Sequence, residues 1–411
     1  MVGPFGLRSH GTMSVRALPL ARALVARGHA VTMLLPATQD PEDAGQSWED
    51  AGVQIENLPL PAGVPGWFHL RLSRALARRA LALHPDVVHV FKPKAYAGLA
   101  HWFLVHRSSA PHVVLDTDDW EGPGGWNDLN PYPEILKLFF TWQERWGLRH
   151  ADAITVASRA LQTLSWAQGG DPERVFYVPN GVEGGQSRAA ASSGPRESGG
   201  RPTLLLYTRF FEYDLSRLWR VVAKVRATHP EVRLWVVGKG FFGEEETLLR
   251  LARDANWRVA DALPPSPDDD LVYAGWVPPD ALPAHFARAT IALYPFDDTL
   301  VNRTKCPVKL LDLLAAGIPV VGESVGQVAE TLTPYVTEET PMQAAETGIL
   351  VPPGDEDAFV NAILALLEDD VRRRAVGARA AAAIRTRLSW INLAESVERA
   401  YRYAVGSKGE A

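Results

Sequence analysis

Residues 302–322 read NRTKCPVKLLDLLAAGIPVVG, and this stretch indicates both a fold and a type of binding site. The pattern predicts a loop, a short helix that begins after Pro307, and a buried strand over Ile318–Val321. Lys309 and Asp312 are three residues apart, so they share one face near the N-terminal end of the helix. Unpaired N–H groups and a lysine suit a phosphate, and a carboxylate suits sugar hydroxyls. A surface helix with one exposed ion pair would explain the same residues.

On both sides of this stretch, apolar runs alternate with helical patterns in two blocks, which implies parallel sheets covered by helices on both faces. The chain opens with only Met1-Val2 where a first strand is expected, so either the true start lies upstream or a stub suffices. The predicted strands are Ala30–Leu35, Val53–Leu58 (after a polar loop), Val87–Phe91, Val113–Leu115, Ala153–Val156, Phe176–Val178, Thr203–Thr208, Val232–Val237, Val272–Gly275, Thr290–Tyr294 and Gly348–Val351. The predicted helices include Ser14–Arg27, Phe68–Leu83, Glu134–Leu148, Leu215–Thr228, Glu244–Asp254, Asp280–Ala287 and three more after Val351.

Length and composition are those of an ordinary globular protein. A chain of 411 residues predicts two domains, and 46% apolar and 22% charged residues are typical values. A net charge of −6 argues against nucleic acid as a partner. No apolar run reaches the length of a membrane span, and no signal peptide is visible. The single cysteine, Cys306, excludes an internal disulfide and is interpreted as structural, so we expect a cytoplasmic protein.

The opening stretch resembles the donor-site signature of glycosyltransferase family 4, a family of retaining transferases that use nucleotide sugars. That signature is Glu-x7-Glu followed by Ala-x-Gly-x-Pro-Val-Val, and Ala315–Val321 matches its second part. Asp312 falls on the second Glu and Thr304 on the first, so the chain departs from the pattern at both positions. Pro179–Val182 (Pro-Asn-Gly-Val) also resembles the turn that closes the first domain in this family.

The resemblance implies an α/β fold of the GT-B type, with two Rossmann-like domains facing a central cleft and C-terminal helices that cross back to the N-terminal domain. The implied parts are an acceptor domain over 1–183, a Gly/Ser/Pro-rich linker over 184–202, a donor domain over 203–387 and a returning helix over 388–411.

On the donor side, Arg209 matches the Arg of the family's Gly-Arg-Leu-x3-Lys-Gly motif and follows a predicted strand, at the sheet edge where such folds bind ligands. The Lys of that motif is replaced by Asp214. We therefore expect Lys309 to supply the second positive charge for a diphosphate, and Arg209 and Lys309 to be catalytic because charge builds on the leaving group. An exposed loop arginine is the alternative for Arg209.

Further donor contacts are implied by position. Asp312 would hold the ribose, and Thr304 and Gly11 would lie beside the donor. Gly275, Trp276 and Val277 match the segment that lines the nucleobase pocket in the family, although Trp276 could equally be a core residue. The resemblance implies no cofactor besides the donor sugar nucleotide and no metal.

On the acceptor side, the loop Gly3–Gly11 resembles the family's glycine loop, and His10 and Arg16 are candidates for acceptor or phosphate contacts or else ordinary loop and helix residues. Asp118 and Asp119 follow a predicted strand, where many family members have His-Asp. We expect them to recognise acceptor hydroxyls, with Asp119 as a candidate base; a solvated acidic loop is the alternative.

Aromatic and basic residues in the first block allow two interpretations. Trp142 and Trp146 are four residues apart, which is typical of a packed core stripe. Arg71, Arg74 and Arg78 share one helix face, which is either a solvated face or a peripheral contact with the inner membrane leaflet.

The sequence thus predicts a retaining glycosyltransferase that moves a sugar from a nucleoside-diphosphate sugar to a glycan, lipid-linked or small-molecule acceptor. Two alternatives stay open. One is a non-catalytic GT-B partner subunit, which the departures at Thr304 and Asp214 would explain. The other is a sugar phosphorylase or nucleotide-sugar epimerase of the same fold.

Overall fold

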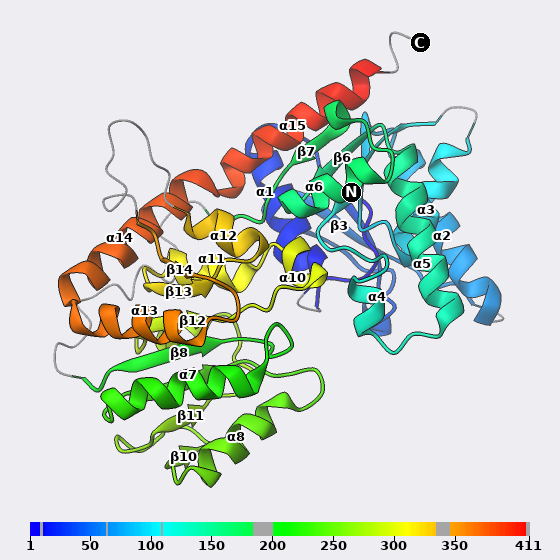
Figure 1. The fold of residues 1–411 in the computed structure, drawn as a ribbon. Helices are drawn as coiled ribbons and strands as arrows, with labels where there is room; N and C mark the ends of the chain where they lie inside the picture. Colours follow the sequence, from blue (N-terminus) through cyan, green and yellow to red (C-terminus); the bar gives the residue numbers. More distant parts are fainter. Residues whose placement is uncertain (9–10, 63–64, 108–109, 184–199, 334–345, 408–411) are drawn as a thin grey trace, which may run out of the picture. The chain divides into compact units, whose positions relative to one another are not determined.

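The computed structural model describes residues 1–8, 11–62, 65–107, 110–183, 200–333 and 346–407 (Figure 1). The chain forms two compact units. The first unit contains Met1–Gly181, Arg303–Cys306 and Leu388–Ala411, and the second contains Val182–Asn302 and Pro307–Arg387. Most of the predicted linker lies outside the described residues. The short segment Arg303–Cys306, inside the stretch that opened the sequence analysis, groups with the first unit.

The sheet of the first unit is parallel except at one edge. Its strands are β1 (Thr32–Pro36), β2 (Ser47–Asp50), β3 (Val53–Leu58), β4 (Val87–Phe91), β5 (His112–Thr117), β6 (Ala153–Val156) and β7 (Val175–Tyr177), in the orders β1-β3-β2 and β4-β5-β6-β7. Val2 makes parallel bridges to Leu34 and Val90, so the short N-terminal segment joins the two parts. Val2 thus occupies the place between β1 and β4 where a first strand was expected. The polar loop predicted before Val53 is wrong in part, because Ser47–Asp50 pairs antiparallel with β3.

Helices cover both faces of this sheet. A π-helical turn (Met13–Ala17) leads into α1 (Leu18–Ala26), which packs with the C-terminal helix α15 (Trp390–Ser407) through a shared apolar core (Figure 1). Right-handed crossovers put α2 (Pro65–Ala82), α3 (Ala95–Val105), α5 (Glu134–His150) and α6 (Arg159–Ala167) on the opposite face. Short helical turns occupy Pro41–Asp43, Trp126–Leu129 (α4) and Pro172–Arg174. Ser158 caps α6 by accepting a hydrogen bond from the backbone N–H of Leu161.

The second unit has a seven-stranded parallel sheet in the order β10-β11-β9-β8-β12-β13-β14. The strands are β8 (Thr203–Tyr207), β9 (Arg233–Val237), β10 (Val259–Ala260), β11 (Leu271–Tyr273), β12 (Ile291–Tyr294), β13 (Val320–Glu323) and β14 (Ile349–Val351). The strand order reverses between β8 and β12. Ligands of open parallel sheets bind at the carboxyl ends of the strands beside such a reversal, so this edge is where a site is expected.

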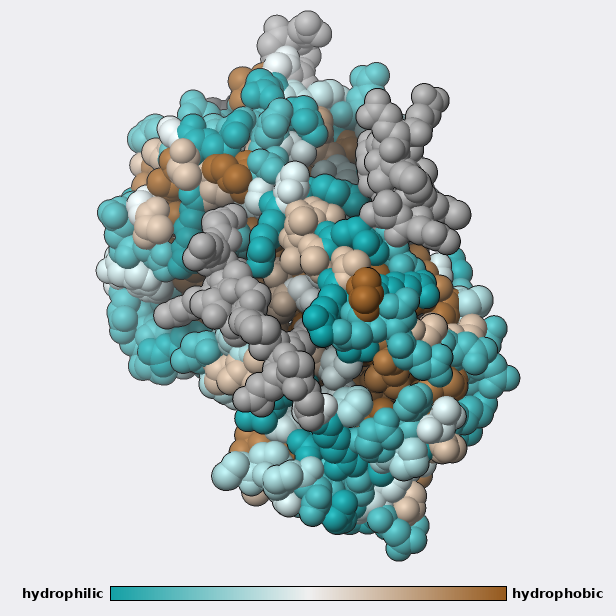
Figure 2. Space-filling model, turned by 90° about the vertical axis from the view of Figure 1, so that its left-hand side faces the viewer, coloured by the Kyte–Doolittle hydropathy of each residue, from teal (hydrophilic) through white to brown (hydrophobic). Residues whose placement is uncertain are grey.

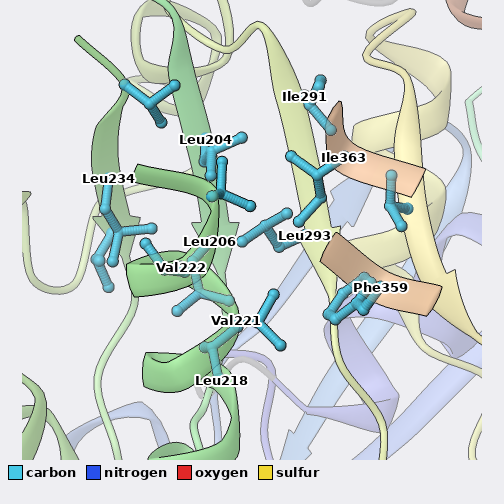
Figure 3. Packing of buried hydrophobic residues seen from close by; sticks show 14 of the residues in the cluster. Leu204, Leu206, Leu218, Val221, Val222, Leu234, Ile291, Leu293, Phe359 and Ile363 are labelled. Atoms are coloured by element: carbon cyan, nitrogen blue, oxygen red, sulfur yellow. The ribbon is translucent and has the colours of Figure 1, made fainter. Parts of the chain in front are cut away.

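Buried aliphatic residues hold the second unit together. Helices α7 (Leu215–Thr228), α8 (Glu244–Asp254) and α13 (Glu356–Glu368) cover one face of its sheet, and α9 (Leu282–Phe286), α11 (Val308–Ala315) and α12 (Gly326–Leu332) follow strands on the other. Figure 3 shows Leu218 and Val221 of α7 and Phe359 and Ile363 of α13 pointing at Leu206 and its neighbours on the sheet. The remaining helices are α10 (Leu300–Thr304) and α14 (Asp370–Arg387). The face drawn in Figure 2 is mostly hydrophilic, with hydrophobic residues in small groups.

The stretch that decided the fold forms the predicted elements with two corrections, and the first is that its strand covers Val320–Glu323 rather than Ile318–Val321. Pro307 is the N-cap residue of α11, Gly317 ends it with φ 70°, and β13 follows. The loop predicted from Asn302 is wrong at its start, because Leu300–Thr304 is helical. Within the described parts of the chain, every helix is too short or too polar to cross a bilayer.

Candidate functional site

The carboxyl edge of the second unit's sheet brings Lys309 onto an aromatic ring. Lys309 lies in the first turn of α11, and its Nζ is 3.7 Å from the ring centre of Tyr207, the last residue of β8. A cavity of about 10 Å³ beside them is also lined by Tyr213 and Tyr294. The predicted cation is therefore held at the strand-order reversal, within its own unit.

Asp312 lies one turn further along α11 and shares this electrostatic environment. Burial raises the pKa of Asp312 to about 7, although the charge of Lys309 opposes the shift. Burial also raises the pKa of Tyr207, and there Asp312 adds to the shift while Arg209 reduces it. Lys309 thus contacts the Tyr207 ring, and the charges of Arg209 and Asp312 act on the same tyrosine.

Arg209 follows β8 and is half-buried. The guanidinium carbon lies 5.7 Å from the ring centre of Phe241. Among the residues that the structure describes, no carboxylate or carbonyl accepts a hydrogen bond from this guanidinium. Its N–H donors are thus available to an anion, and a planar guanidinium can bind two oxygens of a phosphate at once.

The predicted base-binding segment follows β11 at the same edge. Gly275 has φ 65°, and its carbonyl accepts a hydrogen bond of 2.7 Å from the N–H of Gly238. Trp276 is 62% exposed, so the core interpretation of this residue is wrong. Val277 is half-buried. Contact of these residues with a nucleobase stays a prediction.

The two departures from the family pattern have local roles. Asp214 is the N-cap residue of α7 and accepts a hydrogen bond of 2.8 Å from the N–H of Ser216. Thr304 is buried and belongs to the first unit, where its carbonyl accepts a hydrogen bond of 2.7 Å from the Ser158 hydroxyl. Neither position supplies the charge that the family pattern has there.

A buried ion pair that the sequence analysis missed supports the loop after β12. Glu323 ends β13, is fully buried, and accepts hydrogen bonds from Arg217 of α7 and from the N–H of Phe296 (2.6 Å). Arg217 also contacts Asp297 at 2.5 Å. The sequence could have indicated this ion pair, because a buried glutamate at the end of an apolar strand requires a cation or hydrogen-bond donors as partners.

In the first unit, lysines and carboxylates gather where β4 and β5 end. We call Lys92, Lys94, Asp118, Asp119 and Glu121 the lysine–carboxylate cluster. The Nζ of Lys92 lies 2.7 Å from Asp119 and 3.3 Å from Asp118, and the Nζ of Lys94 lies 2.6 Å from Glu121. Lys92 has φ 59°, a left-handed conformation that is strained for a residue with a side chain.

The two aspartates of this cluster differ in proton affinity. Burial raises the pKa of Asp118 to about 6, against the attraction of Lys92 and with repulsion from Asp119. Burial alone would also raise the pKa of Asp119, but the charge and hydrogen bond of Lys92 lower it below its usual value. Asp119 therefore carries the negative charge, whereas Asp118 is mostly protonated below about pH 6. Thr12 donates a hydrogen bond of 2.5 Å to Asp118.

The sequence analysis did not select Lys92 or Lys94. Both follow β4 directly, at the same sheet edge as the aspartates after β5, and that placement was the available signal. Among the described residues, no group of three His, Cys, Asp or Glu side chains is arranged to hold a metal ion.

Arg16 is not an acceptor contact, which corrects the prediction. The side chain is fully buried and donates to Asp116 through Nε (2.8 Å) and Nη2 (2.6 Å), and to the carbonyl of Val178. The partner Asp116 is also fully buried. Arg16 thus belongs to the core of the first unit.

Gly11 lies at the start of the first helix. The carbonyl of Gly11 accepts hydrogen bonds from the N–H groups of Ser14 and Val15, and a Cβ at Gly11 would meet the Phe5 ring at 2.8 Å. Its predicted contact with the donor stays a prediction, and His10 lies outside the described residues.

The predicted core stripe on α5 is wrong for Trp142, which is 44% exposed and stacks on Phe139 at 5.8 Å. Arg71, Arg74 and Arg78 are exposed on α2.

Comparison with known proteins gives the family of both parts. Residues 11–181 match the model of the glycosyl transferase 4-like domain, and residues 201–369 match that of glycosyl transferases group 1. The chain is 26% identical over 402 residues to the GDP-mannose-dependent alpha-(1-6)-phosphatidylinositol monomannoside mannosyltransferase of Mycobacterium tuberculosis, covering 95% of this chain and 94% of that protein. It is 29% identical over 281 residues to the D-inositol 3-phosphate glycosyltransferase of Acidothermus cellulolyticus, covering 63% of this chain and 56% of that protein.

Solved structures give the same fold. Sucrose-phosphate synthase from Thermosynechococcus elongatus has a TM-score of 0.69 at 18% identity, with 98% of both chains covered. The catalytic domain of starch synthase IV from Arabidopsis thaliana has a TM-score of 0.70 at 12% identity, also with 98% of both chains covered. The chain therefore belongs to the family 4-like, group 1 glycosyltransferases, and each of its two parallel-sheet units has the topology of a GT-B domain.

Proposed function

We propose that this glycosyltransferase moves a sugar, with retention of anomeric configuration, from a nucleoside-diphosphate sugar to a hydroxyl of a glycan, lipid-linked or small-molecule acceptor. One observation carries the proposal: Lys309 contacts Tyr207 at the strand-order reversal of the second unit, where the charges of Arg209 and Asp312 also act on Tyr207. Two cations there suit a diphosphate, and one carboxylate beside them suits the hydroxyls of a ribose.

The chemical role of the two cations follows from the charge that develops in the reaction. When the bond between the sugar and the diphosphate breaks, negative charge builds on the leaving group. Arg209 and Lys309 stabilise that charge without a metal, and removal of one such donor typically costs about a hundredfold or more in turnover. Activity that survives EDTA is expected, and activity that depends on added divalent metal would contradict this part of the proposal.

The donor to test first is GDP-mannose, since the Mycobacterium tuberculosis relative is named as GDP-mannose-dependent. UDP-glucose is the second donor, because a structural neighbour from Anabaena, matched at a TM-score of 0.65 and 15% identity over 97% of both chains, was solved with UDP and glucose.

On the acceptor side, Asp119 is the charged group that the first unit offers to a hydroxyl. Lys92 keeps the pKa of Asp119 low despite burial, so the carboxylate accepts hydrogen bonds over the physiological pH range. Asp118 lies beside it, within 3.3 Å of the same lysine. This arrangement favours the recognition of hydroxyls over the solvated-loop interpretation, because both carboxylates are mostly buried.

We also propose peripheral contact with an anionic, cytoplasmic membrane surface. Helix α5 exposes Ile135 (79%) and Leu138 (70%) on the face that also carries Trp142, and α2 exposes Trp67 together with its three arginines. Apolar side chains flanked by basic ones favour the surface of an anionic bilayer. The protein should sediment with vesicles that contain phosphatidylglycerol, and the double variant Ile135→Ser/Leu138→Ser should sediment less. Equal sedimentation of both proteins would contradict this surface.

The decisive experiment on function is a thermal-shift panel with GDP, UDP, ADP, CMP and dTDP. A nucleotide at about a hundred times its dissociation constant adds roughly 2.7 kcal/mol of stability. One nucleotide should raise the melting temperature, and Arg209→Ala should abolish the rise. The matching sugar nucleotide is then supplied with candidate acceptors, and NMR of the product reports the anomeric configuration.

The non-catalytic partner subunit remains the second candidate. Asp214 and Thr304, which replace charged residues of the family pattern with a helix cap and a neutral residue, favour it. A panel in which no nucleotide shifts the melting temperature, together with a stable complex with another transferase, would select this candidate. Phosphate-dependent cleavage or epimer formation without an acceptor would select the phosphorylase or epimerase instead.

A further inference from the structure

Two large apolar side chains are exposed beside the predicted diphosphate site. Phe241 is 52% exposed and Phe242 is 73% exposed, and both lie in the loop Gly238–Gly243 between β9 and α8. Exposed aromatic rings are costly for a folded protein, because their apolar surface stays in contact with water. The two rings therefore raise the question of what each contacts.

The loop that carries Phe241 is fixed at both ends. Gly238 has φ 126°, and a Cβ there would lie 1.9 Å from the carbonyl oxygen of Thr208, so the loop packs directly on the residue before Arg209. Further along, the N–H of Gly240 donates a hydrogen bond of 3.0 Å to the side chain of Glu245 in the first turn of α8. Phe241 is thus presented from a defined backbone position.

Phe241 contacts the loop that follows the neighbouring strand β8. Its ring centre lies 5.2 Å from that of Phe211, which follows β8, and 5.7 Å from the guanidinium carbon of Arg209. A cation within about 6 Å of an aromatic ring centre is attracted to the ring face. This attraction engages no N–H donor, whereas a carboxylate partner would occupy two of them.

We propose that Phe241 is a positioning residue that holds the Arg209 guanidinium at the sheet edge while leaving its N–H donors to an anion of the diphosphate class. The inference rests on the proposed donor site and adds a residue that the sequence pattern did not select. Phe242 contacts Phe241, with ring centres 6.3 Å apart, but has no contact of this kind with Arg209 among the described residues. Phe242 is therefore the matched control.

The test measures binding of inorganic pyrophosphate and of GDP or UDP by calorimetry. Phe241→Leu keeps an apolar side chain but removes the ring, and a cation–π contact of about 0.5–1 kcal/mol predicts about two- to fivefold weaker binding of each ligand. Phe241→Trp should restore the affinity, and Phe242→Leu should leave it unchanged.

The outcomes separate this inference from the proposed function. If Arg209→Ala loses the binding that the wild type shows and Phe241→Leu keeps it at full strength, the role of Phe241 is overturned and the proposed donor site is not. Equal weakening by Phe241→Leu and Phe242→Leu also overturns it, because the effect would then belong to the loop. A wild type that binds neither pyrophosphate nor any nucleotide overturns the donor site itself.

Discussion

Replacing Arg16 by methionine should destabilise the first unit more than any surface substitution. The guanidinium makes two hydrogen bonds to Asp116, one of 2.8 Å to the carbonyl of Val178 and one of 3.1 Å to the side chain of Asn180. In Arg16→Met, Asp116 keeps a hydrogen bond of 2.6 Å from Thr155 but loses its counter-charge while fully buried.

The expected cost follows from that burial. Removing one partner of a buried ion pair typically costs about 3–5 kcal/mol, because the remaining charge has neither water nor a counter-ion. With a urea m-value of about 3 kcal/mol/M, the unfolding midpoint should fall by about 1–1.7 M. The double variant Arg16→Met/Asp116→Leu removes the orphaned charge as well. It should therefore be more stable than Arg16→Met alone, although Val178 and Asn180 lose a donor in both.

Urea unfolding followed by circular dichroism measures these differences. Hydrogen exchange should also rise in the peptide that covers β5 and the following aspartates, since Asp116 lies in that strand. A midpoint for Arg16→Met within about 0.3 M of the wild type would refute the reasoning, because a buried pair cannot lose one member at so small a cost. A double variant less stable than the single one would refute it too.

Three further predictions concern single positions. Gly238→Ala should lower the stability by about 2 kcal/mol or more in a thermal melt, because the new Cβ would overlap the Thr208 carbonyl oxygen. The control is Gly28→Ala, where φ is 93° but no atom lies within 4 Å of the new Cβ, and it should cost only about 1 kcal/mol. Burial raises the pKa of Asp312 to about 7, so the folded state retains a proton that the unfolded chain releases near pH 4. The stability of the wild type should therefore fall as the pH rises from 5 to 8, by about 2–3 kcal/mol relative to Asp312→Asn. Urea titrations of both proteins at the two pH values measure this difference. Lys92→Met should destabilise the protein more at pH 8 than at pH 5, because the carboxylates that lose their cation are then ionised, and equal costs at both pH values would contradict this.

Local sequence signals were enough to predict many elements. Helix α7 begins after the cap Asp214 and α8 after Gly243, and both have the predicted bounds. Strand β4 also has its predicted bounds. In these segments the apolar period, the cap and the flanking turn all indicate the same element. Tertiary contacts therefore did not change the structure that the local sequence favours.

The missed elements lack such a pattern. Helix α3 (AYAGLAHWFLV) is apolar on nearly all sides because it lies between α2 and α5, and a helix without a polar face has no amphipathic period to detect. Strand β2 (SWED) is mostly exposed, and it exists because its backbone pairs with the edge of β3. The pairing depends on tertiary structure, and the residues of β2 alone do not indicate it.

The site shows the same division between local and distant information. Arg209, Lys309 and Asp312 were selected because each follows a strand or lies near the start of a helix in a recognisable motif, and their contact with a donor stays a prediction. Arg16 was misassigned because its partner Asp116 is 100 residues away, and an exposed arginine and a buried paired one look alike in sequence. Lys92 was missed because its pairing with the aspartates requires β4 and β5 to be neighbours.

The charges at the two sheet edges are arranged differently, and the difference bears on which unit binds which substrate. In the second unit, Arg209 and Lys309 lie near aromatic rings, and among the described residues no carboxylate accepts a hydrogen bond from the Arg209 guanidinium. In the first unit, Lys92 lies among carboxylates that neutralise it. A diphosphate gains more from a cation without a carboxylate partner, such as Arg209, whereas neutral hydroxyls gain from a carboxylate acceptor such as Asp119, whose pKa Lys92 lowers. This difference supports the proposal that the second unit binds the donor and the first unit binds the acceptor.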